Sequence, residues 1–187
     1  VYTDKGSSGD ALEILKDHGL NFMRLRIWHT PSGGYCGLGR TLAMAARIRH
    51  LGLGFLLDIH CSDTWADPGR QTKPVAWADL AFDDLTDSVY YYTRHVIAAL
   101  DSQNTLPEMV QLGNEITCGM LWNEGRVCSP YDTPQQWSRL AALLSAGVRG
   151  VVRGVHPSDS TRVSPGAGLG RAGQIPRRRD RRGRDRR

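Results

Sequence analysis

The stretch Met109-Val-Gln-Leu-Gly-Asn-Glu-Ile-Thr-Cys-Gly119 combines a short apolar run with a carboxylate at the point where that run ends. The apolar part follows a proline and stops at Gly113, which is the length and boundary pattern of a buried strand. Asn114 and Glu115 come directly after it. A carboxylate at the C-terminal end of a buried parallel strand is costly unless it is paired or takes part in chemistry. The alternative is that Glu115 caps the next element or lies solvated in a loop.

Helix and strand patterns alternate on both sides of this stretch. Apolar residues at helical spacing, bounded by capping residues and glycines, predict four helices, and short apolar runs predict three strands. The connecting residues 1–9, 29–39, 61–78 and 114–132 are expected to be loops. The predicted helices are 10–18, 40–51, 79–100 and 133–155, and the predicted strands are 21–28, 54–60 and 109–113. This α-β-α-β-α-β-α order predicts an α/β fold with a parallel sheet.

The first two strands differ in their pattern. Residues 54–60 are apolar without alternation, which a strand covered on both faces requires. Residues 21–28 alternate, with Arg24 and Arg26 on one face and apolar side chains on the other. Two arginines on the inner face of a sheet need anionic or carbonyl partners. The other interpretation is that both face water at a sheet edge.

Polar and aromatic residues follow the C-terminal ends of all three strands, which lie side by side in a parallel sheet. Tryptophan faces can cover the C–H surface of a sugar, while Asp, Asn, Arg and His can bond its hydroxyls. One or two of the tryptophans are equally compatible with a place in the core, and the helical spacing of Trp137 predicts that it packs there. The predicted mouth consists of Arg24, Arg26, Trp28, Asp58, His60, Asp63, Trp65, Asp67, Trp77, Asn114, Glu115 and Trp122.

Length and charge limit the remaining possibilities. A chain of 187 residues can form one domain, but it is short for a complete eight-fold βα barrel of about 250 residues. The net charge is +5, and the Arg-rich residues 177–187 carry +6 of it, so residues 1–176 carry −1. We therefore expect no nucleic-acid partner for the body of the chain. No apolar run approaches the roughly 20 residues needed to cross a bilayer, so no membrane partner is expected.

No motif indicates a metal or a cofactor. The four cysteines show neither a Cys-x-x-Cys pair nor a zinc-type cluster with histidine. Cys118 and Cys128 could close a loop as a disulfide, and free thiols are an equally good interpretation. The sequence has no phosphate-binding glycine loop and no Gly-x-Ser-x-Gly elbow.

The composition changes after His156-Pro157. Residues 158–187 contain mainly Gly, Pro, Ser and Arg, and cannot form the buried strand that should come next. One interpretation is a disordered Arg/Gly-rich tail that binds nucleic acid or an acidic surface. The other, which we favour, is that the reading frame is lost near Arg162. We accordingly expect a domain at 1–157 and a separate segment at 158–187.

Several of these motifs resemble glycoside hydrolase family 53, the endo-β-1,4-galactanases that cut arabinogalactan. The Ser-Asp-Thr-Trp-Ala-Asp-Pro stretch that starts at Ser62 is the most specific of them, and the resemblance extends from about residue 9 to residue 157. The matching motifs are Leu15-Lys-Asp-His-Gly-Leu-Asn21, Arg24-Leu-Arg-Ile-Trp28, Gly34-Tyr-Cys36, Leu56-Leu-Asp-Ile-His60, Ser62-Asp-Thr-Trp-Ala-Asp-Pro-Gly69, Gln71-Thr-Lys-Pro74, Gly113-Asn-Glu-Ile-Thr117 and Gly119-Met-Leu-Trp122.

The resemblance implies a (β/α)8 barrel, of which this chain would supply strands two to four with their helices. It also implies a retaining mechanism in which Glu115 is the acid/base with a raised pKa. Asn114 would hold a sugar hydroxyl, and Arg26 and His60 would lie near the nucleophile. Arg24, Asp58, Asp63, Trp65, Asp67, Trp28 and Trp122 would belong to the same substrate-binding mouth. The implied substrate is β-1,4-galactan of type I arabinogalactan, and the implied protein is a secreted monomer without a cofactor, although no signal peptide is visible in this chain.

The departures from the family pattern limit these expectations. The nucleophile of the family is a glutamate on the seventh strand, and no residue of this chain can be assigned to that role. Cys61 stands where the family usually has a tyrosine, which would weaken one sugar contact. We therefore expect an N-terminal-half fragment that is inactive and aggregation-prone alone. The alternative function is a non-catalytic carbohydrate-binding or interaction module that keeps the tryptophan-rich mouth.

Overall fold

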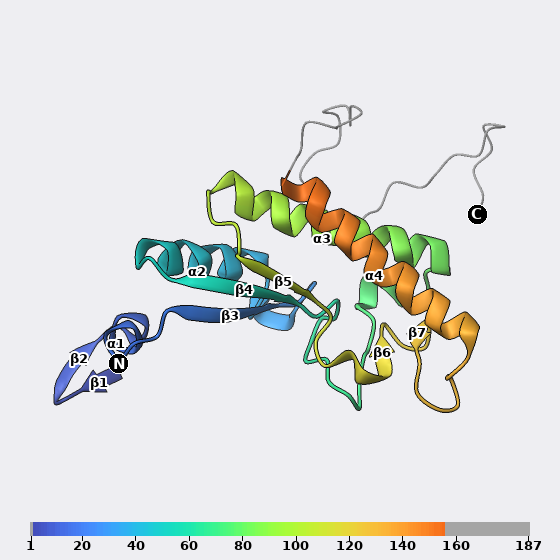
Figure 1. Cartoon of the computed structure of the whole chain (residues 1–187), viewed down its shortest axis with the longest axis horizontal. Helices are drawn as coiled ribbons and strands as arrows, with labels where there is room; N and C mark the ends of the chain where they lie inside the picture. The colour runs from blue at the N-terminus through green and yellow to red at the C-terminus, as the bar shows by residue number, and fades with distance from the viewer. Residues whose placement is uncertain (1, 156–187) are drawn as a thin grey trace.

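The computed structural model describes residues 2–155, whose centre is a three-stranded parallel sheet in the order β3–β4–β5. Strand β3 (Phe22–Ile27) pairs with β4 (Gly54–Ile59), and β4 pairs with β5 (Met109–Leu112). These are the three predicted strands, each within two residues of its predicted bounds. The strands point the same way, so their C-terminal ends meet at one edge, next to the segment that contains β6 and β7 (Figure 1).

The register of the sheet decides which side chains meet at that edge. Arg26 lies opposite Asp58, and Asp58 lies opposite Gln111 on the third strand. Because side chains alternate between faces along a strand, Arg24, Arg26, Asp58 and Gln111 all project on the same side. The two arginines are therefore on the same face as the carboxylate that could pair with them.

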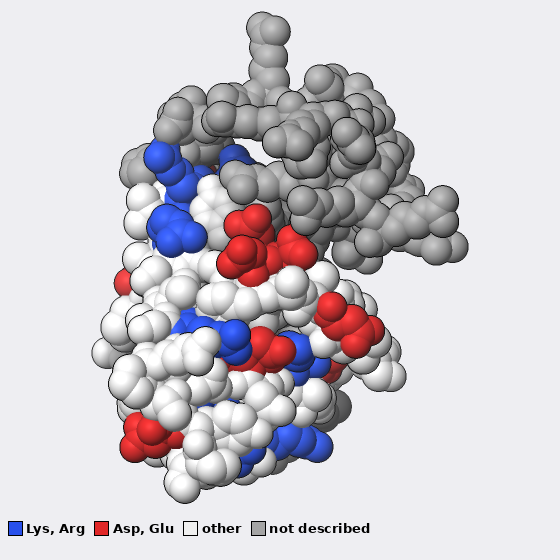
Figure 2. All heavy atoms as spheres, turned by 90° about the vertical axis from the view of Figure 1, so that its right-hand side faces the viewer, with Lys and Arg blue, Asp and Glu red and all other residues white. Residues whose placement is uncertain are grey.

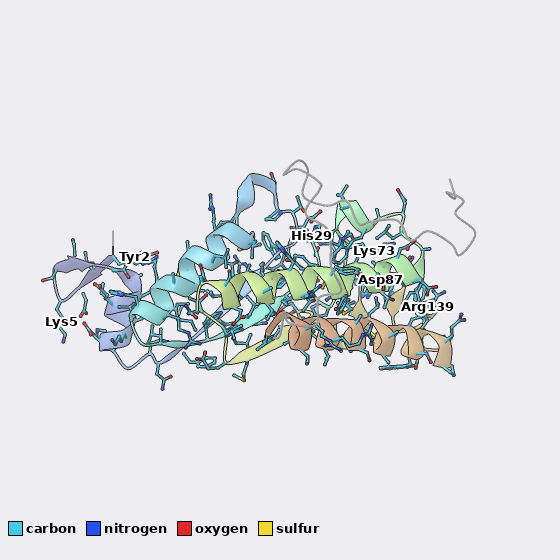
Figure 3. All side chains as sticks on the ribbon, turned by 90° about the horizontal axis from the view of Figure 1, so that it is seen from above. Tyr2, Lys5, His29, Lys73, Asp87 and Arg139 are labelled. Atoms are coloured by element: carbon cyan, nitrogen blue, oxygen red, sulfur yellow. A yellow bond between two sulfur atoms is a disulfide. The ribbon has the colours of Figure 1, made fainter. Side chains whose placement is uncertain are left out.

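The predicted helices are all present. Helices α2, α3 and α4 cover one face of the sheet, as they would on the outside of a βα barrel (Figures 1 and 3). The short α1 begins after Asp10, whose side chain accepts a hydrogen bond from the Leu12 backbone N–H at 2.9 Å. The bounds are Ala11–Asp17 for α1, Leu38–His50 for α2, Phe82–Ser102 for α3 and Pro134–Val155 for α4.

Helices α3 and α4 lie side by side because glycines on α4 let the two backbones approach. A Cβ atom on Gly150 would meet the Tyr90 carbonyl oxygen at 2.7 Å, and one on Gly154 would meet Ile97 Cβ at 2.6 Å. Any larger side chain at these two positions would push the helices apart. The contact fixes α4 over β5, the strand that Asn114 and Glu115 follow.

The core lies between the sheet and these helices. Phe55, Leu57 and Ile59 of β4 are each 0% exposed. Burying a side chain of this size is worth about 1.5–3 kcal/mol. The helix-facing side of this strand is thus fully buried. Asp58, which projects from the opposite face of the strand, is also buried, at 1% exposed.

The prediction of a loop over residues 1–9 is wrong. Strands β1 (Tyr2–Asp4) and β2 (Ser7–Gly9) form an antiparallel hairpin. The two turn residues, Lys5 and Gly6, both have positive φ, as the two-residue turn of a tight hairpin requires. Figure 3 shows Tyr2 and Lys5 at one end of the molecule, far from Arg139 on α4. A single lysine–glycine turn signal in a polar segment does not distinguish this hairpin from a loop.

The predicted loops after the three sheet strands contain short elements of their own. They consist of the 3-10 turns η1 (Ser32–Gly34), η2 (Val75–Trp77) and η3 (Ile116–Cys118) and the two-residue strands β6 (Gly119–Met120) and β7 (Gly125–Arg126). Strands β6 and β7 pair antiparallel. We call residues 118–128 the disulfide hairpin, because a bond between Cys118 and Cys128 closes it.

The sheet has two open edges within residues 2–155. Strands β3 and β5 each pair on one side only, and Met109 at the start of β5 is 53% exposed. The predicted tail at 158–187 and the predicted domain boundary lie outside the described residues. In the described part, no helix is both long and apolar enough to cross a membrane.

Candidate active site

Side chains from all three strand ends are joined by one guanidinium nitrogen. Arg24 Nη2 donates to Asp58 Oδ2 at 2.8 Å and to Asn114 Oδ1 at 2.7 Å. Arg24 is on β3 and Asp58 is on β4, while Asn114 follows β5. The anionic partner expected for this arginine is therefore Asp58. These two hydrogen bonds fix the position of the Asn114 side chain relative to β3 and β4.

His60 continues this set of contacts below the surface. Its Nδ1 lies 3.2 Å from Trp28 Nε1 and 3.3 Å from the Ala66 backbone nitrogen, and both of these groups are N–H donors. Nδ1 must therefore be an acceptor, which assigns the ring proton to Nε2. Nε2 lies 3.1 Å from Asp58 Oδ2 and donates to it. The imidazole is neutral and has both nitrogens engaged.

Arg24, Asp58, His60 and Trp28 together form what we call the strand-end network. The side chain of Asp58 is 2% exposed, and burial of a carboxylate is tolerable only when it is paired. Its Oδ2 accepts from both Arg24 and His60, while Oδ1 has no partner among the described residues. Asp58 and His60 are thus enclosed by the network, and Arg24 is its half-exposed member.

Arg26 lies beside the network in a group of aromatic rings. Its guanidinium carbon is 4.8 Å from the centre of the Trp65 ring and 5.3 Å from that of Trp28, within the range of cation–π attraction. Its Nε donates to Cys36 Sγ at 3.2 Å and its Nη2 to the Tyr35 hydroxyl at 3.3 Å. The hydrogen bond to Cys36 raises the pKa of Arg26, which keeps it a cation. Within residues 2–155 this cation forms no ion pair with a carboxylate.

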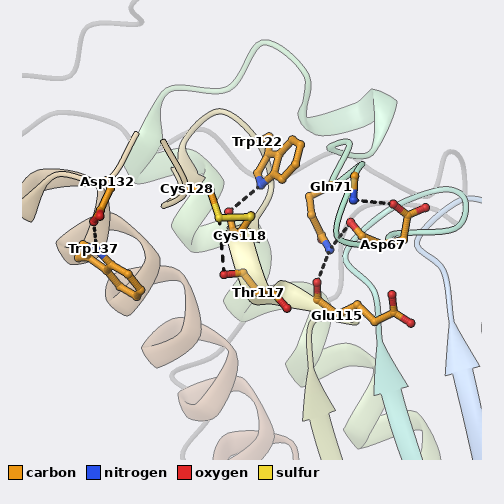
Figure 4. The surroundings of a disulfide bond; sticks show 10 residues. Asp67, Gln71, Glu115, Thr117, Cys118, Trp122, Cys128, Asp132 and Trp137 are labelled. Atoms are coloured by element: carbon orange, nitrogen blue, oxygen red, sulfur yellow. Dashed lines mark hydrogen bonds between the residues drawn. A yellow bond between two sulfur atoms is a disulfide. The ribbon is translucent and has the colours of Figure 1, made fainter. Parts of the chain in front are cut away.

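Asn114 and Glu115 have opposite environments. Asn114 is 2% exposed, and its Nδ2 donates to the Ala66 carbonyl at 2.7 Å in addition to the bond that its Oδ1 accepts from Arg24. The Glu115 side chain is exposed. Its backbone has φ 49° and ψ 46°, in the left-handed region that a non-glycine residue rarely adopts. Figure 4 shows the Glu115 carboxylate pointing away from the disulfide hairpin, toward the side where β4 and β3 lie.

Gln71 contacts the same two residues and was not among the predicted site residues. It is 2% exposed, and its Nε2 donates to the Asn114 carbonyl oxygen at 2.7 Å. The same nitrogen lies 3.4 Å from the Glu115 carbonyl oxygen and 3.1 Å from that of Asp67. The sequence carried no signal for this contact, because a glutamine in a loop gives no indication of the backbone it will meet.

The two other predicted aspartates hold loops. Asp63 Oδ1 accepts from the Thr30 backbone N–H at 2.8 Å, and its Oδ2 accepts from that of Val75 at 2.9 Å. Asp67 Oδ1 accepts from the Gly69 N–H at 2.8 Å, which closes a local turn. Both carboxylates thus accept hydrogen bonds from backbone N–H groups of the loops, and their predicted contact with a substrate stays a prediction.

Trp122 is presented by the disulfide hairpin. Its Nε1 donates to the Cys118 carbonyl at 3.1 Å, and its own backbone N–H donates to the Gln71 carbonyl at 2.8 Å. The Arg126 guanidinium lies 4.1 Å from the centre of its ring. Figure 4 shows the bond from Trp122 to Cys118, and the residue is held by this bond together with the Gln71 and Arg126 contacts, on a segment where the sequence indicated only a loop.

Two other tryptophans differ in burial. Trp77 is 3% exposed and packs against His29 with 4.7 Å between ring centres, so it belongs to the core rather than to the mouth. The prediction that Trp137 packs in the core is wrong, because it is 51% exposed. Its Nε1 donates to Asp132 Oδ1 at 2.8 Å, and the buried stripe of α4 runs instead through Leu140 and Leu143.

The cysteines divide into a bonded pair and two free thiols. The disulfide alternative holds for Cys118 and Cys128, with an S–S distance of 1.97 Å. Cys61 is 1% exposed, and burial raises the pKa of its thiol to about 12. Cys61 therefore lies in the core, and the weaker sugar contact expected from the missing tyrosine stays a prediction. Among the described residues, no cluster of three or more His, Cys, Asp and Glu could hold a metal ion.

The face at the strand C-terminal ends carries both charge signs. Figure 2 shows Lys and Arg side chains interspersed with Asp and Glu over the described part of this face, separated by wide neutral areas. Among residues 2–155, this surface of mixed charge has no continuous basic patch of the kind that binds a polyanion.

Comparisons with known proteins identify a matching family. A family model described as glycosyl hydrolase family 53 matches residues 1–163. An uncharacterized protein of Niallia circulans is 49% identical over 149 residues, which is 79% of this chain and 41% of that protein. The arabinogalactan endo-beta-1,4-galactanase A of Aspergillus niger is 39% identical over 80% of this chain and 41% of its own length.

A solved structure extends the agreement to the fold. The Ignisphaera aggregans GH53 catalytic domain is 39% identical, with a TM-score of 0.73 over 81% of this chain and 42% of that domain. The predicted fold class, a partial (β/α)8 barrel, is confirmed. The chain spans about 41% of the length of the curated relatives named above.

Proposed function

The chain belongs to glycosyl hydrolase family 53, and on that premise we propose that it supplies the acid/base side of an endo-β-1,4-galactanase active site. The proposed substrate is the β-1,4-galactan of type I arabinogalactan. The observation that carries the proposal is the position of Glu115. It follows β5 at the C-terminal edge of the sheet, where catalytic groups of βα barrels lie, with its side chain exposed beside the anchored Asn114.

The proposed reaction uses Glu115 twice. Its protonated carboxyl gives a proton to the glycosidic oxygen while the bond from that oxygen to the anomeric carbon breaks and a second carboxylate bonds to the same carbon. Glu115, now ionised, then takes a proton from the water that attacks the anomeric carbon and releases the second carboxylate. The two carboxyl groups of such a pair lie about 5–5.5 Å apart. We assign no second carboxylate among residues 2–155.

Asn114 is proposed to hold a sugar hydroxyl. Its Nδ2 carries two hydrogens, and one of them goes to the Ala66 carbonyl. The other hydrogen is proposed to reach the substrate from an amide that Arg24 and Ala66 keep in one orientation. An amide held in this way binds without the entropy loss of ordering a free side chain.

The remaining predicted residues divide into contacting and positioning groups. Arg26 with the rings of Trp28 and Trp65 is proposed to line the sugar site, and Arg26 would hold a neighbouring carboxylate ionised. Asp58 and His60 are proposed to act through Arg24 and Trp28, because both nitrogens of His60 are engaged within the fold and Asp58 Oδ2 is bonded to Arg24 and His60. Trp122 is proposed as a stacking surface at the far side of the mouth.

We propose a secreted monomer. The disulfide between Cys118 and Cys128 supports this placement, since such bonds persist in oxidising compartments and are rare in the cytosol. We propose no nucleic-acid, membrane or cofactor partner for the described residues.

The test uses a chimera in which residues 1–155 replace the matching segment of the Ignisphaera aggregans domain. We call this protein the completed barrel. In it, Glu115→Gln is expected to lower kcat/KM on β-1,4-galactan by about 10²–10⁴-fold, the usual contribution of a general acid. The loss should be smaller on an aryl galactoside whose leaving group needs no proton. Glu13→Gln, on the exposed side of α1, is the matched control and should leave both rates unchanged. Unchanged galactan turnover in Glu115→Gln would remove the proposal.

A second candidate function, a non-catalytic carbohydrate-binding or interaction module, rests on Glu115 being the single catalytic carboxylate that we assign among residues 2–155. The 187-residue chain alone is proposed to be inactive and prone to aggregation, because the two open edges of the sheet within residues 2–155 present unpaired backbone N–H and C=O groups. Galacto-oligosaccharide binding without cleavage, by a soluble and cooperatively melting chain, would favour the binding module. Galactan cleavage by the chain alone would contradict both the inactivity and the module.

A further inference from the structure

The buried side chain of Gln71 supports the backbone of Asn114 and Glu115 from the loop after β4. One amide nitrogen faces the carbonyl oxygens of Asn114 at 2.7 Å and of Glu115 at 3.4 Å. Figure 4 shows the Gln71 side chain reaching across to the Glu115 backbone, on the side away from the Glu115 carboxylate. A single side chain therefore contacts the peptide units on both sides of the Glu115 Cα atom.

The turn that carries Glu115 needs such support. Gly113 has φ 81° and Glu115 has φ 49°, so the chain adopts the left-handed conformation twice within three residues. A left-handed residue that carries a Cβ is strained and persists only where its surroundings hold it. Gln71 supplies a hydrogen-bond donor to this turn, because its N–H groups meet carbonyls that a continuing strand or helix would otherwise have paired.

The same loop is tied to the two sides of the proposed site. The Ala66 carbonyl accepts from Asn114 Nδ2, and the Gln71 carbonyl accepts from the Trp122 backbone N–H at 2.8 Å. Gln71 thus joins Asn114, the residue before Glu115, to Trp122. Gln71 is 2% exposed, and the carbonyls of Asp67 and Asn114 can accept both hydrogens of its Nε2, so this nitrogen has no donor left for a ligand.

We propose that Gln71 is the positioning residue of Glu115. By holding the peptide plane between Asn114 and Glu115, its amide sets the direction in which the Glu115 side chain leaves the backbone. The positioning contact is a property of the chain, and only its consequence for catalysis rests on the proposed function. A misplacement of about 1 Å can cost a catalytic group about 100-fold in rate, so this contact matters for turnover.

Two substitutions separate this role from general loss of packing. Gln71→Met keeps the length of the side chain and removes both N–H donors. Gln71→Glu keeps the shape and replaces the donors by a carboxyl group, which donates one hydrogen bond when protonated and none when ionised. A buried carboxyl titrates above its ordinary pKa of about 4.3, so the Gln71→Glu variant should recover as the pH falls, while Gln71→Met should not.

The first measurement uses the full 187-residue chain and needs no activity. In ¹⁵N,¹³C-labelled protein we expect a scalar coupling through the hydrogen bond between Gln71 Nε2 and the Asn114 carbonyl carbon. We also expect the Glu115 amide resonance of Gln71→Glu to return toward its wild-type position as the pH falls, with no such return in Gln71→Met. A folded chain without the coupling would overturn the proposal.

The second measurement uses the completed barrel and decides the matter where the chain alone is too aggregated for spectra. We expect Gln71→Met to lower kcat on galactan by about 100-fold with little change in KM. The ratio of Gln71→Glu activity to wild-type activity should rise at least tenfold from pH 7.5 to pH 5. The titratable neighbours Asp67, Arg70, Lys73, Glu115 and Glu124 are present in both proteins, so the ratio removes their contribution.

The outcomes distinguish this inference from the proposed function. If the wild-type completed barrel does not cleave galactan, the proposed function fails and the coupling in the chain still decides the contact made by Gln71. If the wild type cleaves galactan and both variants keep full kcat at every pH, Gln71 does not position Glu115. If both variants lose activity only in proportion to a lowered melting temperature, with no pH recovery, the role is structural and the proposal is wrong.

Discussion

The strand-end network and the disulfide hairpin hold residues of the same mouth by different means. The network members Arg24 and Asp58 lie on paired strands, and His60 follows directly after one, so the sheet register brings them within hydrogen-bond distance. The hairpin depends on contacts distant in sequence. A disulfide closes the base of the hairpin that carries Trp122, and the Trp122 backbone N–H donates to the Gln71 carbonyl.

The two regions thus differ in what determines the positions of their side chains. In the network, position follows from the regular geometry of the sheet, and the side chains saturate one another's hydrogen bonds. In the hairpin, position follows from a few cross-links, each of which can be removed without disturbing a strand. Damage to one region should therefore leave the other intact, and this independence can be tested in the completed barrel.

The largest effect on stability is expected from Asp58→Ala. The substitution leaves His60 Nε2–H buried without an acceptor and removes the ionic partner of Arg24. We expect the free energy of unfolding to fall by about 3 kcal/mol, at the lower end of the range for breaking a buried pair because Arg24 can turn to water. Guanidinium unfolding measures it. Asp87→Ala, on an exposed part of α3 (Figure 3), should change stability by less than about 0.5 kcal/mol.

A somewhat smaller loss is expected from opening the hairpin. Replacing Cys118 and Cys128 by serine removes a cross-link that closes a loop of 10 residues, which is worth about 2–3 kcal/mol. Trp122 fluorescence should become more accessible to quenchers, while the resonances of His60 stay in place. Cys36→Ser, at a free thiol, is the control. Movement of the His60 resonances would show that the two regions are coupled and would contradict their expected independence.

The regular part of this architecture could be predicted from the sequence. Three strands and four helices were placed close to their observed bounds, because apolar periodicity, a capping Asp10 and terminating glycines are local signals. The convergence of polar residues at the C-terminal ends of the parallel strands was also predicted, whereas the pairing of Arg24 with Asp58 was left open. Which residues meet a sugar remains a prediction.

The contacts between loops could not be predicted. Gln71 reaches the backbone of residues 114 and 115 across more than 40 positions of sequence, and no local pattern marks a side chain that will bond a distant carbonyl. The helical spacing of Trp137 was misleading, because an indole with a hydrogen-bond partner in Asp132 can remain at the surface. Disulfide and free thiols were equally compatible with Cys118 and Cys128, since pairing depends on geometry.

A smaller contribution is expected from the ion pair that ties the hairpin to the preceding loop. Lys73 Nζ lies 3.0 Å from Glu124 Oε1, and the two side chains are 13% and 24% exposed. A double-mutant cycle with Lys73→Met and Glu124→Gln should give a coupling of about 1 kcal/mol, near the upper value for exposed pairs because this one is partly shielded. A coupling near zero would mean that the disulfide and the backbone bonds hold the hairpin without it.

The smallest effect is expected from His29, on the loop after β3. Burial lowers the pKa of its imidazole, and the nearby Asp63 opposes this only in part. The unfolded chain, with an ordinary histidine pKa of about 6.5, then binds the proton more readily than the folded protein. Stability from this group is therefore present above pH 6.5 and is lost as the pH falls toward the lowered folded pKa.

His29→Phe should flatten this part of the pH dependence, because phenylalanine keeps the ring contacts with Trp77 and Tyr92 at 4.7 and 4.9 Å but does not titrate. Melting temperatures from pH 8 to pH 5 measure the change. The control is His95→Gln at an exposed site of α3, which should leave the slope as in the wild type. A slope that His29→Phe does not reduce would mean that the acid sensitivity does not reside in the buried imidazole of His29.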